Sequence, residues 1–116
     1  MPIRLKRVYD PAAPDDGWRL LTMRRWPRGI RKTHVDQWDK GLAPSIELLS
    51  DIQNGDIDWD DYVPRFHAEM AARPDSIESL AALRARLEAG ETVTLMCSCA
   101  DENHCHRSLL RGLATA

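Results

Sequence analysis

The chain has 116 residues, of which 43% are hydrophobic and 29% are charged. This composition is ordinary for a globular domain and excludes a disordered tail, a coiled coil and a collagen-like fibre. Sixteen Lys and Arg residues against eighteen Asp and Glu residues give a formal net charge of -2, so the overall charge favours no particular partner. The apolar runs are short and the chain does not open with a signal peptide, so we expect one cytoplasmic domain over residues 1–116 with no membrane partner.

The first third of the chain predicts two short strands joined by a loop. Residues 3–9 alternate apolar and basic side chains, which is the period of a half-buried strand. Residues 10–17 are rich in Pro, Asp and Gly and predict a loop, and residues 18–23 predict the second strand. Residues 33–38 then predict a helical turn with Thr33 as its cap.

Two helices are expected in the middle of the chain. The first is entered through residues 42–45 and ends at Asn54-Gly55, a pair that tolerates left-handed backbone geometry. The second carries apolar residues at steps of three and four, the period of an amphipathic helix. We expect it to begin near Asp60 or Asp61, so that Pro64 lies in the first turn, where its missing amide costs little.

The C-terminal third predicts a helix, a buried strand and a last helix. Asp75 and Glu78 have the spacing of a capping box, and Gly90 stands where the C-terminal cap of the same helix belongs. Residues 92–96 are apolar or β-branched at both parities, as in a strand buried on both faces. The order of elements predicts a small single-domain α/β layered fold, with a short, mostly parallel sheet and helices packed on it.

The strongest candidate site lies directly after this buried strand. In parallel α/β folds, ligands collect where a strand ends and the next helix begins, and Cys97, Cys99 and Cys105 fall there. An odd number of cysteines argues against a disulfide framework. One interpretation is a metal site, with zinc as the candidate cofactor and Cys97, Cys99, Cys105 and His106 as candidate ligands.

A second interpretation makes one of these cysteines a catalytic nucleophile. Cys105 is the best placed, because a helix N-terminus and a nearby cation such as Arg107 stabilise a thiolate, and Cys99 is the alternative. Phosphatase-like and rhodanese-like loops need an arginine six residues after the nucleophile, and neither Cys97 nor Cys99 is followed by one. Redox sensing and simple core filling are the remaining interpretations of the three thiols.

Arginines of the N-terminal third form the second candidate site, with Arg24, Arg28, Trp26 and Arg7 as candidate ligand-binding residues. Guanidinium groups match the oxygens of phosphates and carboxylates. We expect Arg24 and Arg28 to approach the cysteines and to take a small anionic ligand, such as a phosphate ester or nucleotide. The alternatives are a nucleic-acid-binding module in which Trp26 stacks on a base, and a metal- or redox-responsive protein without turnover.

Several blocks of the sequence resemble the DUF488 family, in its YeaO-like branch of small bacterial and archaeal proteins. The blocks are Val8-Tyr9-Asp10, Arg24-Arg25-Trp26-Pro27-Arg28-Gly29, Leu42-Ala43-Pro44-Ser45 after Trp38, and the closing Cys-Ser-Cys…Cys-His-Arg. The resemblance implies one DUF488-like domain and an uncharacterised activity. It also implies that the family commonly has an acid where this chain has Met23 and an arginine where it has Leu49.

Overall fold

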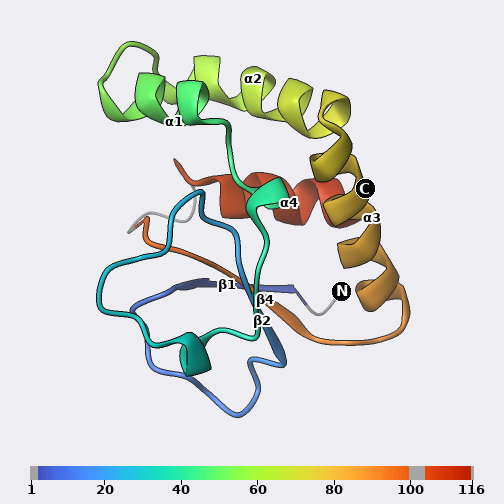
Figure 1. Ribbon diagram of the computed structural model, residues 1–116. Helices are drawn as coiled ribbons and strands as arrows, with labels where there is room; N and C mark the ends of the chain where they lie inside the picture. The colour runs from blue at the N-terminus through green and yellow to red at the C-terminus, as the bar shows by residue number, and fades with distance from the viewer. Residues whose placement is uncertain (1–2, 100–103, 116) are drawn as a thin grey trace.

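The computed structural model describes residues 3–99 and 104–115 and has a four-stranded parallel sheet at its centre, in the order β1-β4-β2-β3 (Figure 1). The strands are β1 (Ile3–Arg7), β2 (Trp18–Leu21), β3 (Gln37–Trp38) and β4 (Val93–Cys97). The helices are α1 (Ile46–Gln53), α2 (Trp59–Ala72), α3 (Pro74–Glu88) and α4 (His106–Thr115), with 3-10 turns η1 (Lys32–His34) and η2 (Lys40–Leu42). The predicted α/β fold with a parallel sheet is confirmed.

Strand β4 is the centre of the sheet. It pairs with β1 on one side and with β2 on the other, and all five of its residues are buried. Successive side chains of a strand point to opposite faces. Leu95 accordingly belongs to the main core with residues of α2, α3 and α4, and Met96 belongs to a smaller cluster with Val8 and Leu21. The strand is buried on both faces, as its lack of polar alternation predicts.

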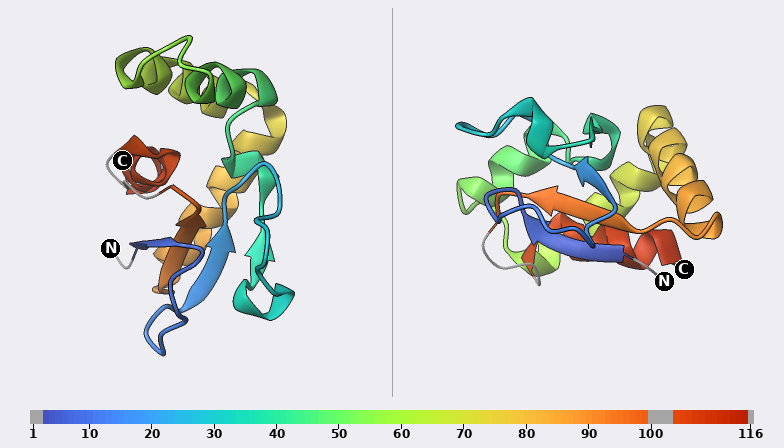
Figure 2. Two further views of the ribbon diagram at one scale, coloured as in Figure 1. Left: turned by 90° about the vertical axis from the view of Figure 1, so that its left-hand side faces the viewer. Right: turned by 90° about the horizontal axis from the view of Figure 1, so that it is seen from below.

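The carboxyl ends of the strands face a layer made of α1 and α2. In the left view of Figure 2 the arrows of β2 and β4 point toward these two helices. The segment after β2 and the segment after β4 therefore leave the sheet at the same edge. Loops that meet at this edge of a parallel sheet build the ligand sites of α/β proteins.

Helix α2 begins slightly earlier than the sequence predicts. Its first residue is Trp59, and Asp58 is the N-cap, accepting a hydrogen bond from the backbone N–H of Asp61 at 2.9 Å. The side chain of Asp61 accepts in return from the N–H of Asp58, which completes a capping box. Pro64 consequently lies in the second turn of α2. The sequence predicts it in the first turn instead.

Helix α3 has no capping box, so the prediction for Asp75 and Glu78 is wrong. The helix begins at Pro74, and its N-cap residue, Arg73, makes no side-chain cap hydrogen bond. A proline is well suited to the first helical position because its φ is already fixed there and its missing N–H needs no partner. The predicted end is confirmed, since Gly90 follows the C-cap with a φ of 84°.

The helical turn expected over residues 33–38 is only partly present. It is the short turn η1, which has no side-chain cap from Thr33, and it is followed by strand β3. The backbone N–H of Asp36 donates to the carbonyl of Arg19, and the N–H of Asp39 donates to the carbonyl of Leu21, each at 2.9 Å. Pairing with β2 therefore draws the segment into the sheet as an edge strand.

The longest helix of the described chain, α3, has fifteen residues. A helix needs about 20 mostly apolar residues to cross the hydrocarbon core of a bilayer. Within residues 3–99 and 104–115, no helix combines that length with sufficient apolar character.

Candidate functional site

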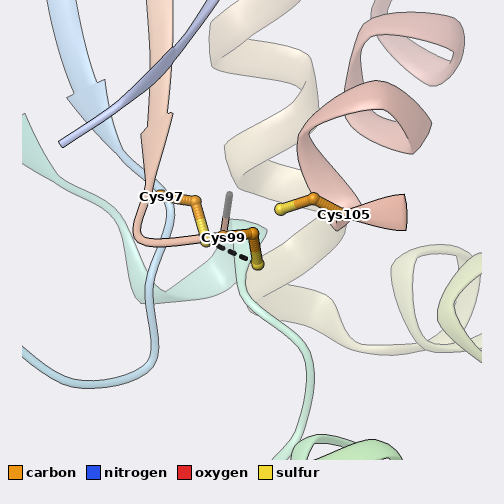
Figure 3. Close-up of side chains that lie close together, drawn as sticks. All are labelled: Cys97, Cys99 and Cys105. Carbon is orange, nitrogen blue, oxygen red and sulfur yellow. Dashed lines mark hydrogen bonds between the residues drawn. The ribbon is translucent and has the colours of Figure 1, made fainter. Parts of the chain in front are cut away.

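The three cysteines meet at the carboxyl edge of the sheet. Cys97 is the last residue of β4, Cys99 lies in the loop that follows, and Cys105 immediately precedes α4. Their Sγ atoms all lie within 4.8 Å of one another, and the Cys97 and Cys99 sulfurs are 3.6 Å apart. Figure 3 shows the three side chains directed toward one another, two from the strand side and one from the helix side. All three are free thiols.

The backbone around this cysteine cluster is held on two sides. The N–H of Val8 donates to the carbonyl of Cys97 at 2.9 Å, which extends the pairing of β1 with β4 by one bond. The N–H of Ser108 donates to the carbonyl of Cys105 at 3.1 Å at the start of α4. One sulfur is therefore fixed by the sheet and another by a helix N-terminus.

The thiols of the cluster influence each other's acidity. Hydrogen bonds from Cys97 and Cys99 hold the pKa of Cys105 far below its usual range, although burial opposes this, and His106 adds to the effect. The hydrogen bond to Cys105 is also the main cause that raises the pKa of Cys97 well above its usual range and the pKa of Cys99 to about 11. The directions of these shifts make Cys105 the thiol of the cluster that loses its proton most readily.

His106 is a buried neighbour of the cluster with a defined orientation. Its Nε2 lies 2.6 Å from the carbonyl oxygen of Thr22 and 3.1 Å from the Thr22 hydroxyl. A carbonyl oxygen only accepts hydrogen bonds, so Nε2 carries a proton. The other ring nitrogen, Nδ1, lies 3.6 Å from the Sγ of Cys105. Thr22, in the segment after β2, therefore orients the imidazole of His106 so that its Nδ1 faces the Sγ of Cys105.

Arg107 is a buried cation beside the cysteines. Its side chain is 1% exposed, and its Nη2 donates to the carbonyl of Cys99 at 2.8 Å. Its Nε has no hydrogen-bond partner in the part of the chain that the structure describes, and there it forms no ion pair with a carboxylate. A buried charge is costly unless an opposite charge compensates it. The guanidinium therefore favours negative charge on the adjacent sulfur atoms, and it counteracts the rise in the pKa of Cys99.

A pocket of about 600 Å³ opens over the cluster, between the sheet edge and helices α1 and α2. All three cysteines line it, together with His104 and His106. Its walls are largely apolar, with contributions from Ile46, Leu49, Ile52, Trp59 and Tyr62. None of the described residues that line the pocket is acidic. Cys99 is the most exposed of the three thiols in the pocket, and Cys97 and Cys105 lie nearly buried beside it.

Of the arginines predicted to bind a ligand, the structure brings Arg24 to this pocket. It lies just after β2, and its Nε donates to the carbonyl of Pro44 at 3.0 Å, which fixes the side chain in place. Arg25, which the sequence analysis did not select, lines the same pocket. Neither side chain forms an ion pair with a carboxylate among the described residues.

The other three candidates, Trp26, Arg28 and Arg7, do not line this pocket. The ring of Trp26 packs edge-on against Trp38 with centroids 5.5 Å apart, within the smaller hydrophobic cluster. Arg28 is exposed at the surface loop, and the exposed Arg7 lies over the ring of Tyr9, 5.6 Å from its centroid. Trp26 is therefore a packing residue here. Arg28 and Arg7 are exposed outside the pocket, although Arg7 is the register partner of Cys97 in the sheet.

Sequence reasoning missed Tyr62 and Trp59 as site residues. Both were assigned only to the apolar face of a helix, and helical spacing does not reveal that one end of that face opens on a pocket. The Trp59 ring stacks on Tyr62 with centroids 5.1 Å apart and meets His104 edge-on at 5.4 Å. Burial, followed by the nearby cysteines, raises the pKa of Tyr62 well above its usual value, so the phenol remains a hydrogen-bond donor at neutral pH. Thr22 was missed because only the fold brings it to His106.

Met23 and Leu49 also line the pocket. These are the two positions at which the resemblance implies an acid and an arginine in related chains. An apolar side chain at both positions leaves this part of the wall without charge. Arg24 and Arg25 consequently supply the formal charge on that side of the pocket.

Comparison with known proteins places the chain in a family. It matches the family model described as "Active DUF488-N3 subclade" over residues 3–115. It is 42% identical over 83 residues to the uncharacterised protein YeaO of Escherichia coli (strain K12), an alignment that covers 70% of this chain and 72% of that protein. It is 40% identical over 70 residues to uncharacterised proteins of Mycobacterium tuberculosis (strain H37Rv) and Mycobacterium bovis, covering 59% of each chain. No solved structure matches. The resemblance is confirmed: the chain belongs to the DUF488 family, in its DUF488-N3 subclade.

Proposed function

We propose that this protein is an enzyme that binds a small anionic ligand, of the phosphate-ester or nucleotide class, and transforms it at the cysteine cluster. The observation that carries the proposal is that three converging thiols and two arginines line one pocket. The description of the matching family as an active subclade also supports an enzyme over a protein that only binds.

An anionic ligand is favoured by the charges of the pocket wall. The Nε of Arg24 is occupied by Pro44, which leaves its two terminal amino groups to form a bidentate contact with a phosphate or carboxylate. Arg25 adds a second positive charge, and no acidic side chain of the described residues competes for either. The apolar walls and the volume of about 600 Å³ suit the organic body of a small molecule.

The reaction centre is the cluster itself. Its chemistry takes one of two forms: Cys105, whose thiolate is favoured at the start of α4, attacks as a nucleophile, or the thiolates hold a metal ion that acts on the ligand. Cys99 is the neighbouring thiol, and the buried Arg107 stabilises negative charge in both cases. The protonated phenol of Tyr62 provides a hydrogen-bond donor on the opposite wall.

A small ligand fits the site better than a strand of nucleic acid. The nucleic-acid alternative uses Trp26 as a stacking platform, and the ring of Trp26 is packed against Trp38. Its Nε1–H is also occupied, donating to the carbonyl of Ile30 at 2.9 Å. The arginine on the proposed binding wall, Arg24, lies in a hollow and not on a convex face.

A pair of matched arginine variants tests the ligand class. Binding of inorganic phosphate and of AMP is measured by isothermal titration calorimetry for the wild type, Arg24→Gln and Arg28→Gln. We expect AMP to bind more tightly than phosphate, because the apolar walls contact its base and sugar. Losing a charged hydrogen-bond donor costs about 1.5–3 kcal/mol, so Arg24→Gln should weaken AMP binding roughly 10- to 100-fold. Arg28→Gln should change it less than about twofold, because it lies outside the pocket.

The same ligand should protect the cluster. In protein freed of metal by a chelator, saturating AMP should slow the alkylation of Cys105 by iodoacetamide at least severalfold in the wild type, and should not do so in Arg24→Gln. Equal effects of the two arginine variants on binding, or binding of AMP without protection of Cys105, would contradict the proposal.

A further inference from the structure

The spacing of the three sulfur atoms is that of a metal-thiolate site. Zinc–sulfur bonds are about 2.3 Å long, so two sulfurs on one tetrahedral zinc ion are separated by about 3.8 Å. Cys97 and Cys99 are 3.6 Å apart, and all three sulfurs lie within 4.8 Å of one another. Closure onto a common ion therefore needs only small side-chain movements. A nucleophilic cysteine, by contrast, needs one accessible thiol and gives no reason for three to converge from a strand, a loop and a helix.

The charges around the cluster favour an anionic centre. A divalent cation with three thiolates carries a net charge of -1. Arg107 is 1% exposed, its Nη2 is bonded to the carbonyl of Cys99, and no carboxylate of the described chain pairs with it. Its Nε also lacks a hydrogen-bond partner there. A negatively charged metal-thiolate group directly beside it supplies the compensating charge that a buried guanidinium requires.

The surrounding scaffold fixes the first ligands and leaves one position open. Cys97 is held by the pairing of β1 with β4 and Cys105 by the start of α4, as second-layer contacts hold metal ligands in general. Among the described residues, the group of candidate ligand atoms lying within 4.8 Å of one another consists of the three cysteines, so His106 is a neighbour of the site and not one of these ligands. Because all three cysteines line the pocket, the fourth coordination position faces it.

We propose that Cys97, Cys99 and Cys105 bind one zinc-class divalent cation, with the fourth coordination position open to the ligand pocket. Soft thiolate ligands select zinc over magnesium or calcium, and three protein ligands with an open position are typical of catalytic zinc sites. The proposal deepens the function proposed above and rests on it only in assigning the open position to the substrate. A cation there polarises a substrate oxygen or activates a bound water. Binding releases the remaining thiol protons to the solvent.

Metal binding is tested on the full chain with cobalt and zinc alone. Protein freed of metal by a chelator is titrated with Co²⁺, and we expect thiolate-to-cobalt charge-transfer absorption that saturates at one ion per chain and disappears when Zn²⁺ is added. Elemental analysis of the zinc-loaded protein should give one zinc. Cys97→Ser, Cys99→Ser and Cys105→Ser should each weaken binding by roughly 100-fold or more, since losing a ligand costs at least as much as losing an outer contact.

Ser108→Ala is the matched control. The Ser108 hydroxyl donates to the carbonyl of Cys105 at 2.9 Å, so this variant disturbs the same helix start without removing a sulfur, and it should still bind one ion. Because a cysteine variant can fail to fold, the wild type provides a second measurement: N-ethylmaleimide should modify Cys99, the most exposed of the three thiols, after the chelator and not in the zinc-loaded protein. Equal modification of Cys99 in both states would contradict the metal site.

The outcomes separate this inference from the proposed function. A wild-type protein that takes up neither Zn²⁺ nor Co²⁺, or whose cobalt spectrum lacks the charge-transfer band, overturns the metal site. Arginine-dependent AMP binding in such a protein would leave the proposed function standing. One bound metal per chain without any AMP binding would support the metal site and contradict the proposed ligand class.

Discussion

Asp16 and Arg107 are two charged side chains that this protein buries almost completely, and the fold treats them in opposite ways. Asp16, 2% exposed, accepts from the Nζ of Lys6 at 2.9 Å and from the N–H of Ala13 at 2.9 Å. Arg107, 1% exposed, has one bond to a carbonyl and no carboxylate partner among the described residues. The pairing of Asp16 serves the fold, whereas Arg107, which has no counter-charge among residues 3–99 and 104–115, supports the anionic centre proposed beside it.

The largest effect on the free energy of unfolding is expected when Asp16 loses its ion-pair partner, Lys6. Lys6→Met leaves the Asp16 carboxylate buried without its cation and should lower the free energy of unfolding by about 3 kcal/mol. The double variant Lys6→Met/Asp16→Asn removes both charges and should recover most of this loss. Both are measured by urea unfolding. A single variant as stable as the wild type would show that this ion pair is not needed, and would remove the contrast with Arg107.

Arg107 should respond differently, because its substitution should affect metal binding more than the stability of the fold. Arg107→Met removes the cation that compensates the metal-thiolate group, so zinc affinity should fall roughly 10-fold, or about 1.4 kcal/mol. In the metal-free protein the same variant should change the stability by less than about 1 kcal/mol, because an uncompensated buried charge is itself costly. Competition with a coloured zinc chelator measures the affinity. A large loss of stability with unchanged affinity would make Arg107 a structural residue.

Acid should affect the paired charge in a predictable direction. Burial disfavours the charged form of Asp16, but the hydrogen bonds from Ala13 and Lys6 outweigh burial and lower its pKa from the usual 3.8. A group with a lowered folded-state pKa stabilises the protein above its unfolded-state value of about 3.9 and loses that contribution as the pH falls through the folded-state value. The stability difference between the wild type and Asp16→Asn should therefore shrink between about pH 5 and pH 2. A difference that is independent of pH would contradict this assignment.

The smallest effect is expected for a pocket residue that carries no charge. Tyr62→Phe removes one hydroxyl from the wall and keeps the ring that stacks between Trp59 and Phe66. Stability in urea should change by less than about 1 kcal/mol, and AMP binding by less than about threefold. Turnover, once a substrate is known, should fall more than binding does if the phenol donates to the reacting group. Equal losses in binding and turnover would limit Tyr62 to ligand contact.

The parts of the fold and of the candidate site that could be predicted from the sequence are those that a local sequence pattern determines. The buried character of residues 93–97 and the glycine after α3 were readable, because strand burial and helix ends leave local patterns. The same holds for the position of the cysteines between a buried strand and a helix start. The capping box expected at Asp75 failed because Pro74, one residue earlier, already suits the first helical position.

The missed parts of the site depend on contacts between distant segments. Arg24 and Arg28 are four residues apart with similar surroundings in the sequence, but only Arg24 lies where the chain leaves β2 toward the cysteines. Residues 37–38 pair with β2, and in the loop between these two strands Trp26 packs against Trp38. This packing keeps Trp26 out of the pocket that the cysteines line. The contact of Thr22 with His106 spans most of the chain. No local pattern predicts such contacts, because they follow from the sheet order.

That sheet order has a consequence for biosynthesis. Strands β1 and β2 come early in the chain, but each is joined to the other only through β4, which comes after residue 90. During translation from the N-terminus, the edges of β1 and β2 that pair with β4 therefore stay unpaired until β4 has left the ribosome, and such late, long-range pairing is slow. The strand that completes the sheet also ends at Cys97, so the cysteine cluster of a nascent chain can form only after the sheet is complete and Cys99 and Cys105 have followed.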